Sequence, residues 1–145
     1  MYVVDASVFV SRFVSTDVNH ARSRDWFRMV RMANSPIFGP NLLLPELSGP
    51  ISRLVDHAIA MSALGKLLRM RWLTLLEIDS RLARRSADLA ADLRLRGADA
   101  VYVSVADRLN FPLVTWDAEQ LTRGALAIEV RSPDQLLPDG GGTQA

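Results

Sequence analysis

Four acidic residues stand where strands are expected to end or helices to begin: Asp5, Glu46, Asp99 and Asp117. Carboxylates at half-buried positions are costly unless a positive charge lies among them, and a hard divalent cation with oxygen ligands is the simplest candidate. A metal ion held in this way can activate a water molecule as a nucleophile and polarise a phosphoryl oxygen, while a second ion would stabilise the leaving oxygen. The four acids therefore point to metal-dependent hydrolysis of a phosphodiester.

The elements that must position these acids follow from the apolar pattern. Short apolar runs predict strands over 3–5, 37–38, 73–78, 113–115 and 127–130. Helical spacing and capping residues predict helices from residue 6, over 17–34, from residue 41, and over 61–71, 79–96, 99–110 and 117–121. This alternation favours an α/β fold with a mainly parallel sheet, in which ligands bind beyond the carboxyl ends of the strands. Asp5 and Asp117 both follow a strand, so we expect them to share one site.

Two glycines are expected to mark helix boundaries. Gly49-Pro50 should kink or interrupt the helix that begins near Asn41, leaving a second piece over 51–57, because proline removes a backbone donor and clashes with the preceding turn. Gly97 should end the helix over 79–96, since glycine tolerates the left-handed conformation that closes many helices. Residues 138–145, with three consecutive glycines, are expected to form a flexible tail behind one domain over 1–137.

The same acids have ordinary structural interpretations. Asp5, Asp99 and Asp117 all stand at helix starts, where aspartate is a good cap, and Glu46 would complement the dipole of its helix. The hydroxyls of Ser7 and Thr115 can bond to local backbone. A capping role and a metal-binding role can coexist, so neither interpretation removes the other.

Composition excludes several classes of protein. The chain has 145 residues and no cysteine, so disulfides, zinc–thiolate sites and thiol catalysis are excluded. No secretory signal and no apolar run of about 18 residues is visible, which predicts a cytoplasmic protein that does not bind membranes. The net charge of +1 excludes a wholesale basic coat for nucleic acid. His20 and His57 have no evident partner, which disfavours a metal-free ribonuclease built on histidine.

Arginine is nearly the only basic residue, and one helix carries a row of it. Arg24, Arg28 and Arg31 recur at i, i+4 and i+7, which places them on one helix face. That face could contact an RNA backbone, although a solvated surface or an acidic partner surface is the commoner explanation. Trp116 adjoins Asp117 and could stack on a base, although core packing is the commoner role of tryptophan.

Four short stretches, taken in order, resemble a known family. They are Val3-Val4-Asp5-Ala6-Ser7, Pro45-Glu46-Leu47, Gly97-Ala98-Asp99-Ala100-Val101-Tyr102 and Leu113-Val114-Thr115-Trp116-Asp117. Together they resemble a PIN domain, and more narrowly the VapC toxins of bacterial toxin–antitoxin pairs. The resemblance covers nearly the whole chain up to about Leu137.

The resemblance implies a three-layer α/β/α fold around a parallel sheet and an acidic pocket that binds Mg²⁺ or Mn²⁺ and cleaves single-stranded RNA. Asp5 and Asp99 would be the principal metal ligands, and Glu46 and Asp117 would complete the cluster directly or through water. Ser7 and Thr115 fall where the family often has a hydroxyl. The resemblance also implies a small cognate antitoxin and a homodimer.

One departure from the family pattern leaves an alternative open. The family commonly has a polar residue, often Asn, four positions after the glutamate on an unbroken helix, whereas this chain has Ser48-Gly49-Pro50-Ile51. A kink there would move Glu46, so the alternative is a catalytically degenerate PIN-like domain that binds RNA or a protein without cleavage. Phosphoryl transfer on a similar sheet is disfavoured, because Ser7 stands where dehalogenase-like phosphatases need a second aspartate. Receiver-type domains need a lysine near the acidic pocket, and the only lysine, Lys66, lies inside a predicted helix.

Overall fold

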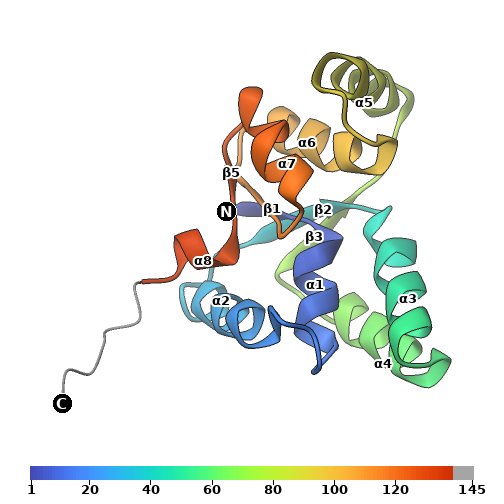
Figure 1. Cartoon of the computed structure of the whole chain (residues 1–145), viewed down its shortest axis with the longest axis vertical. Helices are drawn as coiled ribbons and strands as arrows, with labels where there is room; N and C mark the ends of the chain where they lie inside the picture. The colour runs from blue at the N-terminus through green and yellow to red at the C-terminus, as the bar shows by residue number, and fades with distance from the viewer. Residues whose placement is uncertain (139–145) are drawn as a thin grey trace.

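A five-stranded parallel sheet forms the centre of the protein in the computed structural model, which describes residues 1–138 (Figure 1). The strand order is β3-β2-β1-β4-β5. The strands are β1 (Tyr2–Val4), β2 (Ile37–Pro40), β3 (Leu73–Leu76), β4 (Leu113–Val114) and β5 (Val130–Arg131). Val3 pairs with Phe38 on one side and Leu113 on the other, so β1 is the central strand. The predicted α/β class with a parallel sheet is confirmed.

Helices cover both faces of this sheet. They are α1 (Ala6–Phe13), α2 (His20–Met32), α3 (Leu43–Leu54), α4 (His57–Leu68), α5 (Ser80–Leu93), α6 (Gly97–Leu109), α7 (Ala118–Thr122) and α8 (Pro133–Leu136), with a 3₁₀ turn, η1, at Gly124–Leu126. The helices α1 to α4 lie on one side of the sheet, and α5 to α7 lie on the other (Figure 1). The three-layer arrangement is therefore confirmed. No helix within residues 1–138 is long and apolar enough to cross a membrane.

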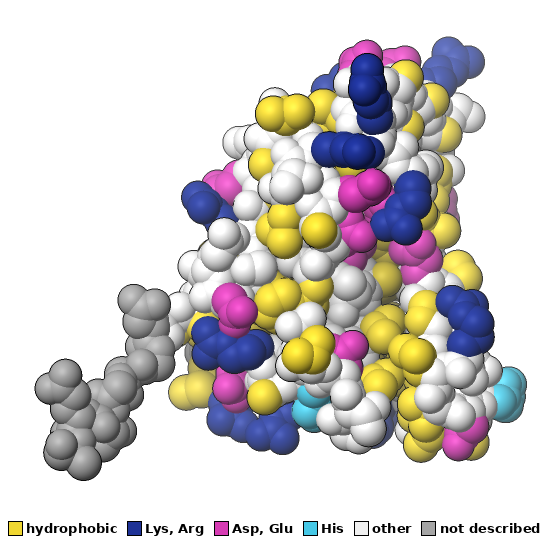
Figure 2. Space-filling view, viewed as in Figure 1, with side chains coloured by type: hydrophobic (Ala, Val, Ile, Leu, Met, Phe, Trp, Pro, Cys, Tyr) yellow, Lys and Arg dark blue, Asp and Glu magenta, His cyan; other side chains and the backbone are white. Residues whose placement is uncertain are grey.

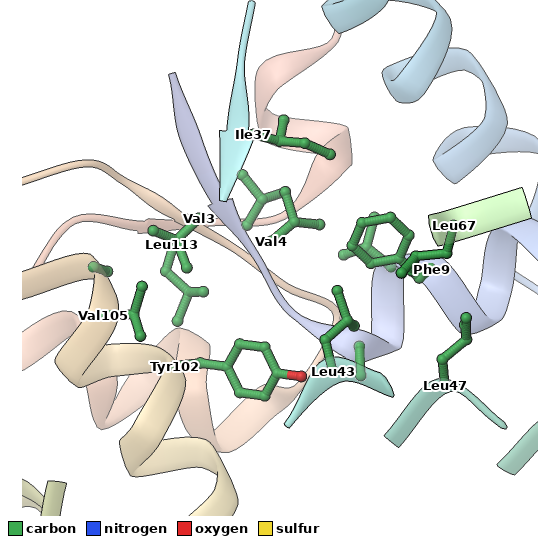
Figure 3. Close-up of a cluster of buried hydrophobic side chains, with 14 of the residues drawn as sticks. Val3, Val4, Phe9, Ile37, Leu43, Leu47, Leu67, Tyr102, Val105 and Leu113 are labelled. Carbon is green, nitrogen blue, oxygen red and sulfur yellow. The ribbon is translucent and has the colours of Figure 1, made fainter. Parts of the chain in front are cut away.

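The core lies on both faces of β1, which explains why this strand is an unbroken apolar run rather than an alternating one. Val3 and Val4 are completely buried. Figure 3 shows them between Val105 of α6 on one side and Phe9 of α1 on the other. Burying one such side chain contributes about 1.5–3 kcal/mol, so this packing fixes where β1 ends and α1 begins.

The expected interruption at Gly49-Pro50 is wrong, because α3 runs without a break through both residues. Leu43, Leu47 and Ile51 recur every four residues and are all completely buried, so one apolar stripe spans the proline and holds a single helix. Pro50 has no backbone N–H, which leaves the carbonyl of Glu46 without its usual helical donor. Both Pro50 and Glu46 line an open cleft, where solvent can bond to that carbonyl.

Other helices also begin or end at residues different from the predicted ones. Gly97 does not end α5 but begins α6, and Arg94 closes α5 in the left-handed conformation with φ of 54°. Helix α4 starts at His57, four residues before its predicted start, because Asp56 caps it by accepting a hydrogen bond from the N–H of Ile59. Most of the predicted flexible tail, from residue 139 onward, lies outside the described residues.

Candidate active site

Asp5 lies at the carboxyl edge of the sheet, immediately after β1, and is only 5% exposed. It caps α1, because its Oδ2 accepts a hydrogen bond from the N–H of Ser7 at 3.0 Å. Burial raises the pKa of the Asp5 carboxyl, and hydrogen bonds from Ser7 and Gln120 only partly oppose this effect. Asp5 is thus a cap, as the sequence allowed, and also a buried carboxylate that forms no ion pair with another residue of the stretch 1–138.

Asp99 lies in the first turn of α6, 9% exposed, and a single side chain joins it to Asp5. The Nε2 of Gln120 donates to Oδ1 of Asp99 at 2.9 Å and to Oδ1 of Asp5 at 3.1 Å. Gln120 belongs to α7 and is completely buried. The structure therefore brings Asp5 and Asp99 together, although 94 positions separate them in sequence.

Asp117 joins the group through an arginine. It caps α7 by accepting from the N–H of Gln120 at 2.9 Å, while its Oδ2 accepts from Nη2 of Arg96 at 2.9 Å. The Nε of Arg96 also donates to Oδ2 of Asp99 at 2.9 Å. Arg96 remains 68% exposed, so its guanidinium covers the outer side of the two carboxylates. Asp117 faces this guanidinium and does not line the cleft described below.

Glu46, in the first turn of α3, lines the same cleft as Asp5 and Asp99. Burial raises the pKa of Glu46, and the negative charges of Asp5 and Asp99 raise it further. The hydroxyl of Tyr102 lies near Glu46, but it makes no hydrogen bond of good geometry within residues 1–138. Burial raises the pKa of Tyr102 far above its usual range, so its hydroxyl stays protonated and keeps a proton that it can donate to a carboxylate.

The two predicted hydroxyls support the turns that carry the aspartates. Thr115 donates from Oγ1 to Oδ2 of Asp5 at 3.2 Å and accepts from the N–H of Asp117 at 2.9 Å. The Oγ of Ser7 accepts from the N–H of Trp116 at 3.0 Å. These bonds tie the β1–α1 turn to the β4–α7 turn. Thr115 therefore bonds to local backbone, as its ordinary interpretation predicts, and also to Asp5, whereas the backbone partner of Ser7 lies 109 positions away in the sequence.

An open cleft of about 530 Å³ lies beside the acids, walled by residues from α1 and α3 and by Trp116. Asp5, Glu46 and Asp99 line it, together with Asp17. The indole of Trp116 is fixed by donation from Nε1 to Oγ of Ser23 at 2.7 Å. Figure 2 shows acidic side chains beside a basic one above a hollow in this region of the surface. The cleft thus gives solvent access to the side of the cluster formed by Asp5, Glu46 and Asp99.

Hard oxygen donors and raised pKa values fit a divalent cation, because a cation would offset the cost of charging these buried carboxylates. Within residues 1–138, however, no three His, Cys, Asp or Glu side chains are already arranged to hold a metal ion. Gln120 and Arg96 donate hydrogen bonds to the two carboxylate oxygens of Asp99, which a metal ion would need as ligands. Metal binding would therefore require Arg96, the exposed one of the two, to move.

This competition gives a first prediction. Replacing Arg96 removes the internal cation from Asp99 and Asp117, so Arg96→Gln is expected to bind Mg²⁺ about fivefold more tightly, as exposed pairs contribute up to about 1 kcal/mol. The measurement is the rise in melting temperature over a series of Mg²⁺ concentrations, from which the dissociation constant of the metal is obtained. Arg123→Gln is the control, because Arg123 pairs with Glu119 instead. An unchanged Mg²⁺ requirement in Arg96→Gln would show that Arg96 does not compete with the metal.

Sequence reasoning missed Arg96, Gln120 and Tyr102. Gln120 stands three residues after the predicted cap Asp117, a spacing that turns a side chain back toward the cap. That spacing was the only local signal for its position. Nothing in the local sequence distinguishes Arg96 from the sixteen other basic residues of the chain.

The fold has close counterparts among solved structures. It resembles the toxin VapC20 of Mycobacterium tuberculosis, which cleaves the sarcin-ricin loop (TM-score 0.72, 16% identity, 88% of this chain and 96% of that one). It also resembles VapBC2 of Rickettsia felis bound to a DNA fragment from its promoter (TM-score 0.69, 16% identity, 90% and 97%). PAE2754 of Pyrobaculum aerophilum is 26% identical (TM-score 0.64, 93% and 92%). No curated protein matches the chain.

The match to a family model covers most of the sequence. The model of the PIN domain matches residues 2–125, a stretch that contains all four acids and the whole of the strands β1 to β4. This match, the parallel sheet in the order 3-2-1-4-5 and the acids at its carboxyl edge agree with one another. The chain belongs to the PIN domain family.

Proposed function

We propose that the protein is a metal-dependent endoribonuclease that hydrolyses single-stranded RNA and serves as the toxin of a VapBC-type pair. PIN domains are nucleases that generally use divalent metal ions. One observation carries the proposal for this chain. The buried carboxylates of Asp5 and Asp99 share the amide of Gln120 at the carboxyl edge of the sheet, beside an open cleft.

In this proposal Asp5 and Asp99 are the principal ligands of Mg²⁺ or Mn²⁺, and Glu46 and Asp117 complete the cluster directly or through water. The metal would supply an activated water and charge stabilisation at the phosphoryl group. Thr115 fixes the orientation of Asp5, and Gln120 keeps the two principal carboxylates at a constant separation. Once released from the carboxylates, the guanidinium of Arg96 can bind a substrate phosphate at the rim of the cleft.

The test is cleavage of a panel of single-stranded RNAs by the purified protein. We expect cleavage with Mg²⁺ or Mn²⁺, none with EDTA, and products that carry a 5′-phosphate and a 3′-hydroxyl. Those termini distinguish two mechanisms. Metal-assisted attack by water leaves the phosphate on the 5′ end of the downstream fragment, whereas attack by the ribose 2′-hydroxyl leaves it on the 3′ end of the upstream fragment. Cleavage that persists in EDTA with 2′,3′-cyclic ends would contradict the metal mechanism.

The proposed partners are a small antitoxin and a second copy of the chain. Similar solved structures include toxin–antitoxin complexes. The acidic cluster suits an arginine inserted by a partner, because Asp99 and Asp117 already pair with Arg96. Five exposed apolar side chains on α3, α4 and the turn between them offer a surface for a homodimer: Leu54, Val55, Ile59, Met61 and Leu68. Co-expression with the adjacent gene tests the antitoxin, and the solution mass from light scattering tests the dimer.

A second candidate is a PIN domain that binds RNA or a protein without cutting. It is favoured by the internal donors, because Arg96 and Gln120 already satisfy Asp99 without a metal. The cleavage assay separates the two. RNA binding without cleavage at any Mg²⁺ or Mn²⁺ concentration would support this candidate and exclude the nuclease.

A further inference from the structure

Four arginines surround a second pocket, which shares no lining residue with the acidic cleft. Arg12 comes from the last turn of α1, and Arg24, Arg28 and Arg31 come from one face of α2. The pocket has a volume of about 560 Å³ and is completed by three apolar side chains: Phe27, Met70 and Trp72. We call it the arginine pocket. No acidic residue lines it.

The positive charge of the arginine pocket is almost uncompensated within residues 1–138. Arg12, Arg24 and Arg31 have no carboxylate within 4.0 Å, and Arg28 reaches only Asp25, at 3.9 Å. Arg85 on α5, in contrast, pairs closely with Asp107 at 2.9 Å, although Arg81 and Arg84 of the same helix have no carboxylate within 4.0 Å in the described residues. Burial lowers the pKa of Arg12, and the charges of the other three arginines lower it further. A bound anion would remove this repulsion.

The apolar part of the arginine pocket adds a second kind of contact. The guanidinium of Arg12 lies 5.6 Å from the ring centre of Phe27, within the range of a cation–π interaction. Trp72 packs edge-on against the same ring at 6.0 Å and is only half-buried. Guanidinium forks suit phosphate, and an accessible indole can stack on a base. This combination favours a nucleic acid over an acidic peptide.

The position of the arginine pocket matters for a nuclease with an acidic cleft. Asp5 precedes α1 and Arg12 lies in its last turn, so about 10 Å of helix separates the two sites along its axis. Trp72 precedes β3, at the amino edge of the sheet, whereas the acids lie at the carboxyl edge. The carboxylates of the cleft repel a polyanion until metal binds, and the net charge of +1 supplies little general attraction. A separate cationic site would bind the RNA despite this repulsion from the carboxylates of the cleft.

We propose that the arginine pocket is a second RNA-binding site, which binds backbone phosphates of RNA outside the segment that enters the acidic cleft. The inference deepens the proposed function and rests on it for the identity of the polyanion. It has two consequences. The affinity for RNA must depend on salt through these arginines, and only an RNA long enough to reach from the cleft around α1 to the arginine pocket can bind more tightly.

The test measures RNA binding by fluorescence anisotropy in EDTA, where the RNA stays intact. We expect the double variant Arg24→Gln/Arg31→Gln to bind long single-stranded RNA about tenfold more weakly. The slope of log affinity against log salt should become about 1.4 less steep, since each phosphate contact to a single strand contributes about 0.7. Binding of a dinucleotide should not change. Neither residue bonds to the acidic cluster, so the metal-induced rise in melting temperature should equal that of the wild type.

The control is Arg81→Gln/Arg84→Gln, which removes the same charge from exposed helical positions without close ion pairs on α5. Equal losses in the two double variants would mean that only net charge matters, and would overturn the proposal. So would a pocket variant that binds RNA like the wild type but no longer co-purifies with the adjacent gene product, because the arginine pocket would then be a protein-docking surface. If the wild type never cleaves RNA but the pocket variant still binds RNA more weakly, the proposed nuclease activity would be refuted. The assignment of the arginine pocket as an RNA-binding site would still be supported.

Discussion

Asp99→Asn is expected to lower RNA cleavage by at least about 100-fold while leaving the fold intact. Asparagine keeps the size of aspartate and one of the oxygens that accept from Gln120 and Arg96. It removes one negative charge beside Asp5, whose pKa Asp99 helps to raise, so the lost hydrogen bond is offset by reduced repulsion. A neutral amide is a poorer ligand for a hard cation, so the Mg²⁺-induced rise in melting temperature should shrink.

The matched control is Asp107→Asn, the same substitution on the same helix. Asp107 lies about two turns further along α6, where it pairs with Arg85. This variant should cleave RNA and respond to Mg²⁺ like the wild type. If Asp99→Asn instead retained both cleavage and the metal-induced shift, Asp99 would be only a structural residue and the nuclease assignment would fail. Loss of activity together with collapse of the metal-free fold would also favour the structural role.

Gln120→Ala is expected to destabilise the metal-free protein by about 2–4 kcal/mol, which corresponds to a drop of about 10 °C in melting temperature. The substitution opens a cavity at a completely buried position and removes the shared donor from Asp5 and Asp99. The two carboxylates would then remain buried with less compensation. Because a cation can replace the lost donor, Mg²⁺ should restore part of the stability and raise the melting temperature more than in the wild type.

Thermal unfolding with EDTA and with Mg²⁺ measures both effects. Glu119→Ala is the control on the same short helix, since the side chain of Glu119 is 42% exposed and pairs with Arg123. It should shift the melting temperature little, as exposed pairs contribute at most about 1 kcal/mol. A large loss of stability that Mg²⁺ does not reduce would mean that Gln120 acts only by filling space, and not by holding metal-binding carboxylates.

The sequence alone determined the strand-helix alternation and the places where acids follow strands. These features are local: a strand such as Val3-Val4 is apolar because both faces of the sheet are covered, and an aspartate after it can cap the next helix within two residues. The order of the motifs then predicted the three-layer fold that the structure confirms. The same local information placed Asp5 and Asp117 at one edge of the sheet, because parallel strands end at the same side.

Only the tertiary structure decided what surrounds the acids. Gln120 reaches Asp5 across 115 positions and Arg96 reaches Asp117 across 21, and such contacts depend on how α6 and α7 pack, which no local pattern encodes. Packing also overruled a local rule at Pro50, because three buried side chains at four-residue spacing outweigh one missing backbone hydrogen bond. The arginine pocket has the same origin: the row on α2 was visible in the sequence, whereas Arg12 and Trp72 join it only because α1 and the start of β3 lie against that helix.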